Sequence, residues 1–156
     1  MKLILFFIEK SIMTEKTSVG IRQYTPLDYA KVREIWKVTG LLRSGDESRI
    51  LQILEKTRHF LLLLVEVDGS VVGVVGAFYI GRVGYVYHLG VHPNFQRRGI
   101  GSLLLSEVCR KLRERNVHLT ILFIPFISNL EKDSERSRFY RRNGFTTIRK
   151  MFVKKL

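Results

Sequence analysis

Cysteine, proline and long hydrophobic runs are all scarce in this sequence of 156 residues, and each scarcity excludes a class of protein. The single cysteine, Cys109, cannot form an internal disulfide, so a disulfide scaffold and a cysteine-rich zinc module are both excluded. With 3 Pro and 12 Gly, the chain is neither collagen-like nor low in complexity. One cysteine also suits a reducing compartment, and we expect a cytoplasmic protein.

The longest apolar run near the N-terminus covers residues 3–8 and ends at two charged residues. A membrane-spanning helix needs about 20 apolar residues, and a secretory signal needs roughly 7 to 15 followed by a cleavage site. We therefore expect no membrane segment. Residues 1–18 are interpreted as an N-terminal extension that runs into the start of the first strand, and residues 19–156 as a single domain.

Acidic residues are few relative to basic ones, 14 against 27, which gives a net charge of +13. The excess is uneven. Residues 1–96 hold 12 Lys and Arg against 9 Asp and Glu, net +3, whereas residues 97–156 hold 15 against 5, net +10. A basic C-terminal part favours polyanionic partners such as a phosphorylated cofactor or nucleic acid. A solvated basic surface is an equal alternative on charge alone.

Hydrophobic periodicity predicts alternating strands and helices along the chain. The expected strands cover residues 19–24, 60–67, 71–80, 85–91 and 117–124, with one or two more within 145–155. The expected helices cover residues 25–40, 47–56 and 133–143, with another that begins near 101. Asp68-Gly69 predicts a tight hairpin, and residues 81–84 predict a second turn. This order of elements is typical of a mixed α+β sheet.

The most informative motif lies between a predicted strand and a predicted helix, at residues 90–101. Gly99 and Gly101 allow backbone N–H groups to turn towards one point, and the helix N-terminus adds its partial positive charge. Arg97 and Arg98 add full charges at the rim of this turn. We interpret the segment as a pyrophosphate-binding site.

Two common phosphate-binding motifs do not match this segment. A Walker A loop requires a lysine before its Ser or Thr, but Gly101 precedes Ser102 here. A dinucleotide-binding fingerprint requires a third glycine where this chain has Leu104. Both motifs are therefore disfavoured.

The segment does resemble the signature of the GNAT (general N-acetyltransferase) superfamily, Arg/Gln-x-x-Gly-x-Gly/Ala, which Gln96 to Gly101 match. Leu89 to Pro93 resemble the Leu-x-Val-x-Pro end of the family's fourth strand, and Phe139 to Phe145 resemble its Phe-Tyr-x-x-x-Gly-Phe motif. With the order of elements, the resemblance covers about 135 residues. It implies an α+β fold, in which a central, mostly antiparallel sheet of about seven strands is flanked by about four helices and is splayed between strands 4 and 5.

The resemblance also implies a cofactor, acetyl-CoA, and no metal. In this family the backbone of the fourth strand pairs with the pantetheine arm, and backbone amides of the following turn hold the pyrophosphate. The residues expected to bind acetyl-CoA are therefore Leu89, Gly90, Val91, Gln96, Arg97, Arg98, Gly99, Ile100, Gly101 and Ser102. The family usually has Asn seven residues before its catalytic tyrosine, where this chain has Asp133. Either Asn129 keeps that contact from a longer loop or the contact is lost, and both residues stay candidates.

Tyr140 occupies the position of the family tyrosine that protonates the departing CoA thiolate. A phenol with an ordinary pKa near 10 is a suitable donor to a thiolate. The general base is open, because the glutamate that some members carry corresponds to Tyr85 here. His88 has the best intrinsic pKa for the role, although a histidine packed against a strand is the alternative, and Tyr87 and an ordered water are further candidates.

The predicted function is that of an acetyl-CoA-dependent N-acyltransferase. It would transfer acetyl to a primary amine of a small molecule, or to a protein N-terminus or lysine, by direct attack in a ternary complex. The alternative is a non-catalytic module that binds acyl-CoA or nucleic acid, which the basic residues 97–156 suggest. The sequence contains no aromatic stacking platform or helix-turn-helix motif that would favour nucleic acid. The family and the apolar extension favour a homodimer.

Overall fold

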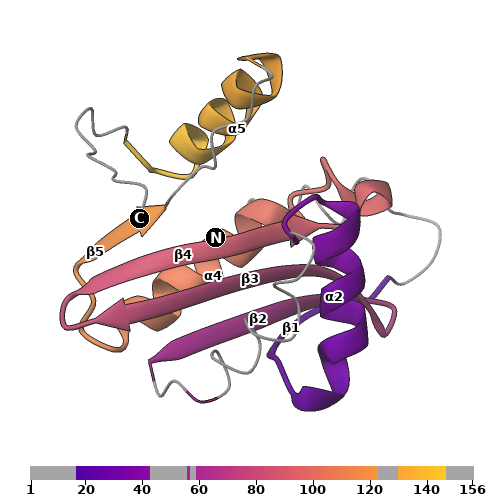
Figure 1. Ribbon diagram of the computed structural model, residues 1–156, viewed down its shortest axis with the longest axis horizontal. Coiled ribbons are helices and arrows are strands. Elements are labelled where there is room, and N and C mark those ends of the chain that lie inside the picture. The colour runs from indigo at the N-terminus through magenta and orange to yellow at the C-terminus, as the bar shows by residue number, and fades with distance from the viewer. Residues whose placement is uncertain (1–16, 43–55, 57–58, 123–129, 147–156) are drawn as a thin grey trace, which may run out of the picture. The chain divides into compact units, whose positions relative to one another are not determined.

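The computed structural model describes residues 17–42, 56, 59–122 and 130–146 (Figure 1). The chain divides into two compact units, Met1–Phe123 and Ile124–Leu156, and each is described by itself. The first unit holds one five-stranded sheet in the order β1-β2-β3-β4-β5. Its strands are β1 (Val19–Gln23), β2 (Phe60–Val67), β3 (Ser70–Ile80), β4 (Val83–Val91) and β5 (Leu119–Leu122). The prediction that residues 19–156 form one domain stays a prediction.

The sheet is mostly antiparallel, as predicted. The pairs from β1 to β4 are antiparallel, whereas β4 and β5 run parallel. The parallel register starts at the Val83–Leu119 pair and ends at the Val86–Leu122 pair, although β4 itself continues to Val91. The splay that the family resemblance predicts between strands 4 and 5 stays a prediction, because the residues that follow Leu122 lie outside the described ones.

Two helices of the first unit cover opposite faces of this sheet (Figure 1). Helix α2 (Tyr29–Val38) follows a 3-10 turn, η1 (Pro26–Asp28), and helix α4 (Ile100–Arg113) follows another, η2 (Pro93–Phe95). A Cβ atom added at Gly73 would lie 3.0 Å from Ile100 of α4, and one added at Gly90 would lie 3.2 Å from Ile35 of α2. The second unit contributes helix α5 (Leu130–Arg142).

Helices α2 and α4 each bury the apolar stripe that their sequence predicts. On the α2 face, one core cluster is formed by Val32, Ile35, Trp36, Leu62, Leu64 and Val74. On α4, the fully buried positions are Leu104, Leu105, Val108 and Leu112, spaced at helical intervals. Burial on both faces explains why β2 reads as a continuous apolar run rather than an alternating one.

The predicted turns are confirmed at one position and corrected at another. Asp68 and Gly69 both have positive φ, 50° and 76°, as a tight hairpin turn requires. The second turn is shorter than predicted, because Gly84 lies in β4 and pairs with Tyr79. A Cβ atom at Gly84 would lie 3.0 Å from Leu112 of α4, so this glycine allows close packing rather than a turn.

The number of strands and some boundaries also differ from the prediction. Among the described residues there are five strands rather than about seven, and three α-helices rather than about four. The predicted strands within 145–155 and the predicted helix over 47–56 lie almost entirely outside the described residues. Helix α5 begins at Leu130 rather than Asp133, and β5 begins at Leu119 rather than Val117.

Candidate active site

The fourth strand carries a β-bulge at His88, one of the candidates predicted for the general base. Val74 of β3 pairs with Gly90 and Gly76 pairs with Tyr87, so β4 has one residue more than β3 between these two pairs. His88 lies within this extra length and has φ of +47°, a left-handed conformation that is uncommon for a residue other than glycine. Such bulges redirect a side chain and are frequent beside active sites.

Gly90 lies just past the bulge, under the C-terminal end of α2. A Cβ atom at this position would lie 3.1 Å from Leu41 and from the Thr39 hydroxyl, and 3.2 Å from Ile35. These distances are shorter than ordinary van der Waals contact, so the absence of a side chain lets α2 approach the backbone of β4 closely. The predicted pantetheine-binding segment, Leu89 to Val91, is thus supported from this side by α2.

The turn between β4 and α4 is closed by its own side chains. The Gln96 amide donates from Nε2 to the Val91 carbonyl oxygen at 2.9 Å, and the His92 imidazole accepts from the Asn94 backbone N–H at 3.3 Å. Arg97 and Gly99 both have positive φ, 62° and 81°. Left-handed residues in such a turn aim successive N–H groups into a concave surface that suits an anion.

Helix α4 begins directly after this turn, with Gly99 as its N-cap. The Gly99 carbonyl oxygen accepts a hydrogen bond from the Leu103 N–H at 3.0 Å. The N–H groups of Ile100, Gly101 and Ser102 precede it and have no acceptor within the helix. The first turn of α4 contains no acidic residue, so the partial positive charge of the helix N-terminus stays available to an anion.

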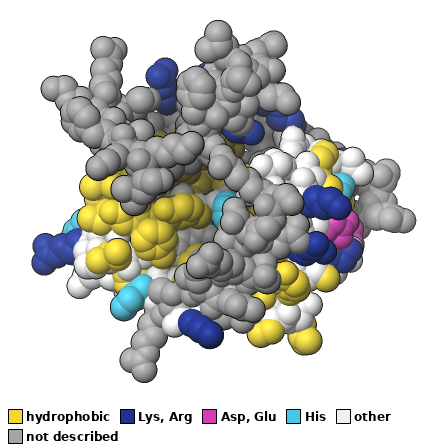
Figure 2. Space-filling view, viewed as in Figure 1, with side chains coloured by type: hydrophobic (Ala, Val, Ile, Leu, Met, Phe, Trp, Pro, Cys, Tyr) yellow, Lys and Arg dark blue, Asp and Glu magenta, His cyan; other side chains and the backbone are white. Residues whose placement is uncertain are grey.

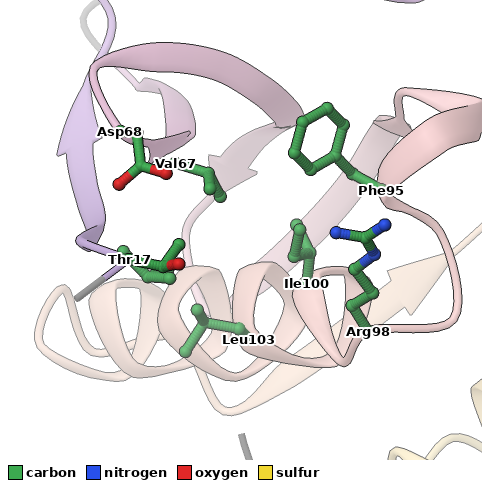
Figure 3. Close-up of a pocket in the computed structure, with 8 residues that line it drawn as sticks. Thr17, Val67, Asp68, Phe95, Arg98, Ile100 and Leu103 are labelled. Atoms are coloured by element: carbon green, nitrogen blue, oxygen red, sulfur yellow. The ribbon is translucent and has the colours of Figure 1, made fainter. Parts of the chain in front are cut away.

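A small cavity of about 160 Å³ lies beside the same helix N-terminus, on the side of β1 and β2 (Figure 3). Ile100 and Leu103 of α4 and Val67 of β2 form its apolar walls, and the Arg98 guanidinium lies 5.3 Å from the centre of the Phe95 ring. Ligand pockets usually enclose roughly 300–1,000 Å³. The cavity is therefore too small for a cofactor. The contact between Arg98 and Phe95 is a cation–π contact, which holds Arg98 on this side of the turn.

An aromatic stack lies on the sheet before the bulge. The Phe78 ring of β3 stacks on Tyr85 at 4.8 Å and on Tyr87 at 5.2 Å. Figure 2, which shows the face that carries α2, shows hydrophobic side chains gathered there. Burial raises the pKa of the Tyr87 phenol, so this phenol is not a base at neutral pH. Sequence reasoning missed Phe78, which the strand register alone brings opposite Tyr85.

His88 is half-buried, and its imidazole packs against Trp36 of α2. The two ring centroids are 4.9 Å apart and the rings are tilted by 58°. Burial lowers the pKa of His88 below the ordinary histidine value, so the imidazole is neutral at pH 7 and keeps one nitrogen able to accept a proton. The sequence carries no signal that pairs Trp36 with His88.

Tyr140 lies near the end of α5, in the second unit. Its ring contacts Phe139 and Phe145, with centroids 5.1 and 6.1 Å away, and its carbonyl oxygen accepts from the Phe145 N–H. Burial raises the pKa of the Tyr140 phenol, and the nearby Arg136 charge partly opposes this shift. The phenol is therefore protonated at neutral pH, as a proton donor must be.

The structure brings the predicted residues of the first unit together along one path, from the bulge at His88 through Leu89–Val91 to the turn at residues 96–102. The predicted residues of the second unit are described separately. Asn129 lies outside the described residues, and Asp133 is placed only as a backbone position in α5. Within the described part of the chain, no group of three or more His, Cys, Asp or Glu could hold a metal ion, and no helix is long and apolar enough to cross a membrane.

Several known proteins are similar to this chain. The family model described as an acetyltransferase (GNAT) domain matches residues 57–147. An acetyltransferase of Photorhabdus laumondii is 36% identical over 107 residues, which cover 67% of this chain and 74% of that protein.

Two solved structures share the fold at low identity. The aminoglycoside N-acetyltransferase AAC(6′)-Iy in complex with CoA has a TM-score of 0.74 at 16% identity, covering 92% of this chain and 99% of the other. An aminoglycoside acetyltransferase from an uncultured soil sample, in complex with sisomicin, has a TM-score of 0.70 at 18% identity, covering 88% and 96%. The fold, the strand–turn–helix motif and the family match agree with the resemblance seen in the sequence, and this chain belongs to the GNAT acetyltransferase family.

Proposed function

We propose that this protein transfers an acetyl group from acetyl-CoA to a primary amine by direct attack in a ternary complex. The observation that carries the proposal is the turn from β4 to α4, where two left-handed residues, Arg97 and Gly99, precede a helix N-terminus without acidic residues. This arrangement suits a pyrophosphate. CoA in a structural neighbour supports the choice of cofactor, and sisomicin in another supports an amine acceptor.

The cofactor would lie along the path described above. The backbone of Leu89, Gly90 and Val91 would pair with the pantetheine arm, and the amides from Arg97 to Ser102 would hold the pyrophosphate. Gln96 would keep this turn closed through its bond to Val91. On α5, several arginines are candidates for the adenosine 3′-phosphate: Arg136, Arg138, Arg141 and Arg142.

The chemistry needs a base and an acid. His88, neutral at pH 7, or a water molecule would remove a proton from the ammonium group of the acceptor. Tyr85 is a weaker candidate, because its ring stacks on Phe78 and a phenol is a poor proton acceptor at neutral pH. The free amine would attack the thioester carbonyl, the tetrahedral intermediate would collapse, and Tyr140 would protonate the CoA thiolate as it leaves. Asn129 and Asp133 stay the candidates for the cofactor contact that the family usually makes through Asn.

Calorimetric titration of the purified protein with acetyl-CoA, repeated with dephospho-CoA, tests this proposal. Micromolar binding of acetyl-CoA supports it, and weaker binding of dephospho-CoA assigns arginines to the 3′-phosphate. A screen of amines would follow, including an aminoglycoside and peptides with a free N-terminus. Absence of acetyl-CoA binding at moderate salt would overturn the proposal, and salt-sensitive binding of RNA or DNA would then favour the non-catalytic module.

A further inference from the structure

We propose that Trp36 is a positioning residue for His88: the indole holds the imidazole at the β4 bulge in one orientation and shields it from water. The proposal deepens the proposed function, because it assigns α2 a part in preparing the acyl-transfer site. The expected change in kcat rests on the proposed function. The contact between the two rings does not, because it can be tested without any acetyl transfer.

The first argument comes from the backbone of the bulge. His88 has φ of +47°, a conformation that non-glycine residues adopt at a cost in free energy and keep where the surrounding structure holds them. The described neighbours of its ring are Trp36, with centroids 4.9 Å apart, and Tyr87, at 6.2 Å. Of these two neighbours, Trp36 is the one that comes from another element. Its contact with the imidazole can therefore help to hold His88 in the strained backbone conformation.

The second argument comes from the indole. Trp36 is only 1% exposed, and its Nε1 is the buried side-chain polar atom without a hydrogen-bond partner among the described residues. A buried donor without an acceptor is unfavourable, and phenylalanine would supply an apolar ring at this position without it. Packing alone therefore does not explain tryptophan. The neutral imidazole beside it carries an acceptor nitrogen.

The third argument is that α2 supports both sides of the bulge. Trp36 contacts His88, and the neighbouring Ile35 and Thr39 lie close to the position that a side chain of Gly90 would occupy. Leu89 lies between these two contacts, so a shift of its backbone would disturb at least one of them. A displacement of Trp36 should thus also shift the backbone of Leu89–Val91, the segment that is proposed to bind the pantetheine arm.

The electrostatic surroundings of His88 agree with this role. Burial lowers its pKa, and neither ring neighbour is charged at neutral pH, since burial and Tyr85 together raise the pKa of Tyr87. The charged residues of α2 that lie nearest to Trp36 in the sequence, Arg33, Glu34 and Lys37, are exposed. On the other side, β3 passes the bulge with Val75, which is not titratable.

The test uses the fact that Trp36 is the only tryptophan of the chain. A protonated imidazole in contact with an indole quenches its fluorescence. In the parent protein we expect the Trp36 emission to fall as the pH drops below the ordinary histidine pKa of about 6.5. In His88→Asn we expect the emission to show no such change with pH. Asparagine tolerates the left-handed backbone, so this variant keeps the bulge. The matched control is His59→Asn, because His59 packs against Tyr79 instead and its loss should leave the titration unchanged.

A second variant tests the positioning itself. In Trp36→Phe, the NMR titration of the His88 ring should move towards pH 6.5, and kcat should fall by about 10- to 100-fold. Val32→Ala is the control for core damage, because Val32 is fully buried in the same cluster without a ring contact to His88. It should lower stability and leave the His88 titration in place.

Emission that does not titrate, or a titration that survives in His88→Asn, would overturn the contact. An unchanged His88 titration in folded Trp36→Phe would overturn the positioning role. If Trp36→Phe does not fold, Trp36→Tyr takes its place in the NMR titration of His88, and the fluorescence comparison, which leaves Trp36 unaltered, still decides the ring contact. A normal fluorescence titration in a protein that does not bind acetyl-CoA would instead overturn the proposed function and leave the ring contact standing.

Discussion

The side-chain amide of Gln96 donates a hydrogen bond to the carbonyl oxygen of Val91 at 2.9 Å, so the last residue of β4 is tied to the turn that precedes α4. The bond fixes the turn before any anion arrives. Preformed donors bind an anion better because no free energy is lost in arranging them.

Replacement of Gln96 by alanine should therefore weaken acetyl-CoA binding by up to about tenfold, the equivalent of one ordinary hydrogen bond. Calorimetry of the purified variant measures this change. The control is Asn94→Ala, since Asn94 lies in the same turn and is exposed. Equal affinities of Gln96→Ala and the parent protein would show that the turn is held in other ways.

Gly99 caps α4 with φ of +81°, a conformation that costs other residues about 1–2 kcal/mol. Gly99→Ala should thus lower the free energy of unfolding by roughly that amount and loosen the start of the helix. Gly101→Ala is the comparison, because Gly101 lies within the helix, where alanine is favoured over glycine. Urea denaturation of the two variants should rank Gly99→Ala below Gly101→Ala, and the reverse order would contradict the strain argument.

Tyr140→Phe removes the proposed proton donor and keeps the ring that packs on Phe139 and Phe145. We expect kcat to fall on the order of 100-fold, as for loss of a general acid, with acetyl-CoA affinity unchanged. Burial raises the pKa of this phenol, so the parent enzyme should lose activity only at strongly alkaline pH, and that loss should vanish in the variant. Full turnover of a folded Tyr140→Phe would remove Tyr140 from the mechanism.

A partly buried ion pair should make stability depend on pH. Arg22 donates to both carboxylate oxygens of Asp28, at 2.6 and 2.7 Å, and the Thr25 N–H and hydroxyl also donate to that carboxylate. These bonds hold the pKa of Asp28 far below its usual range. Because the folded-state pKa is depressed, the stabilisation is complete above pH of about 4 and is lost as the pH falls further.

Asp28→Asn should accordingly lower the free energy of unfolding at pH 7 by about 2 kcal/mol and should flatten its fall between pH 4 and 2. Denaturation curves at several pH values give both quantities. Glu34→Gln serves as the control, because Glu34 forms an exposed pair with Lys31 and contributes little. Parallel pH curves for the parent and Asp28→Asn would rule out this pair as the source of the acid sensitivity.

Much of the fold and of the strand–turn–helix segment of the candidate site could be predicted from the sequence, because the signals are local. The Asp68-Gly69 turn needs positive φ at neighbouring residues, and the strand–turn–helix segment around Gly99 carries its glycines and helix start within a few positions. The apolar stripes of α2 and α4 likewise follow from spacing along one helix. A family resemblance carried by such short motifs was confirmed by the family match.

What the sequence could not supply depends on register and on contacts between distant segments. Gly84 reads as a turn residue until the strand pairing places it beneath Leu112. His88 reads as an ordinary strand residue until one extra residue in β4 forms a bulge and turns its ring towards Trp36. Sequence by itself determined which elements form and which turn is the candidate anion site, because those depend on neighbouring residues. Only the tertiary structure decided which side chains meet at the bulge, because that depends on how the strands pair and on how closely α2 can approach the glycine at position 90.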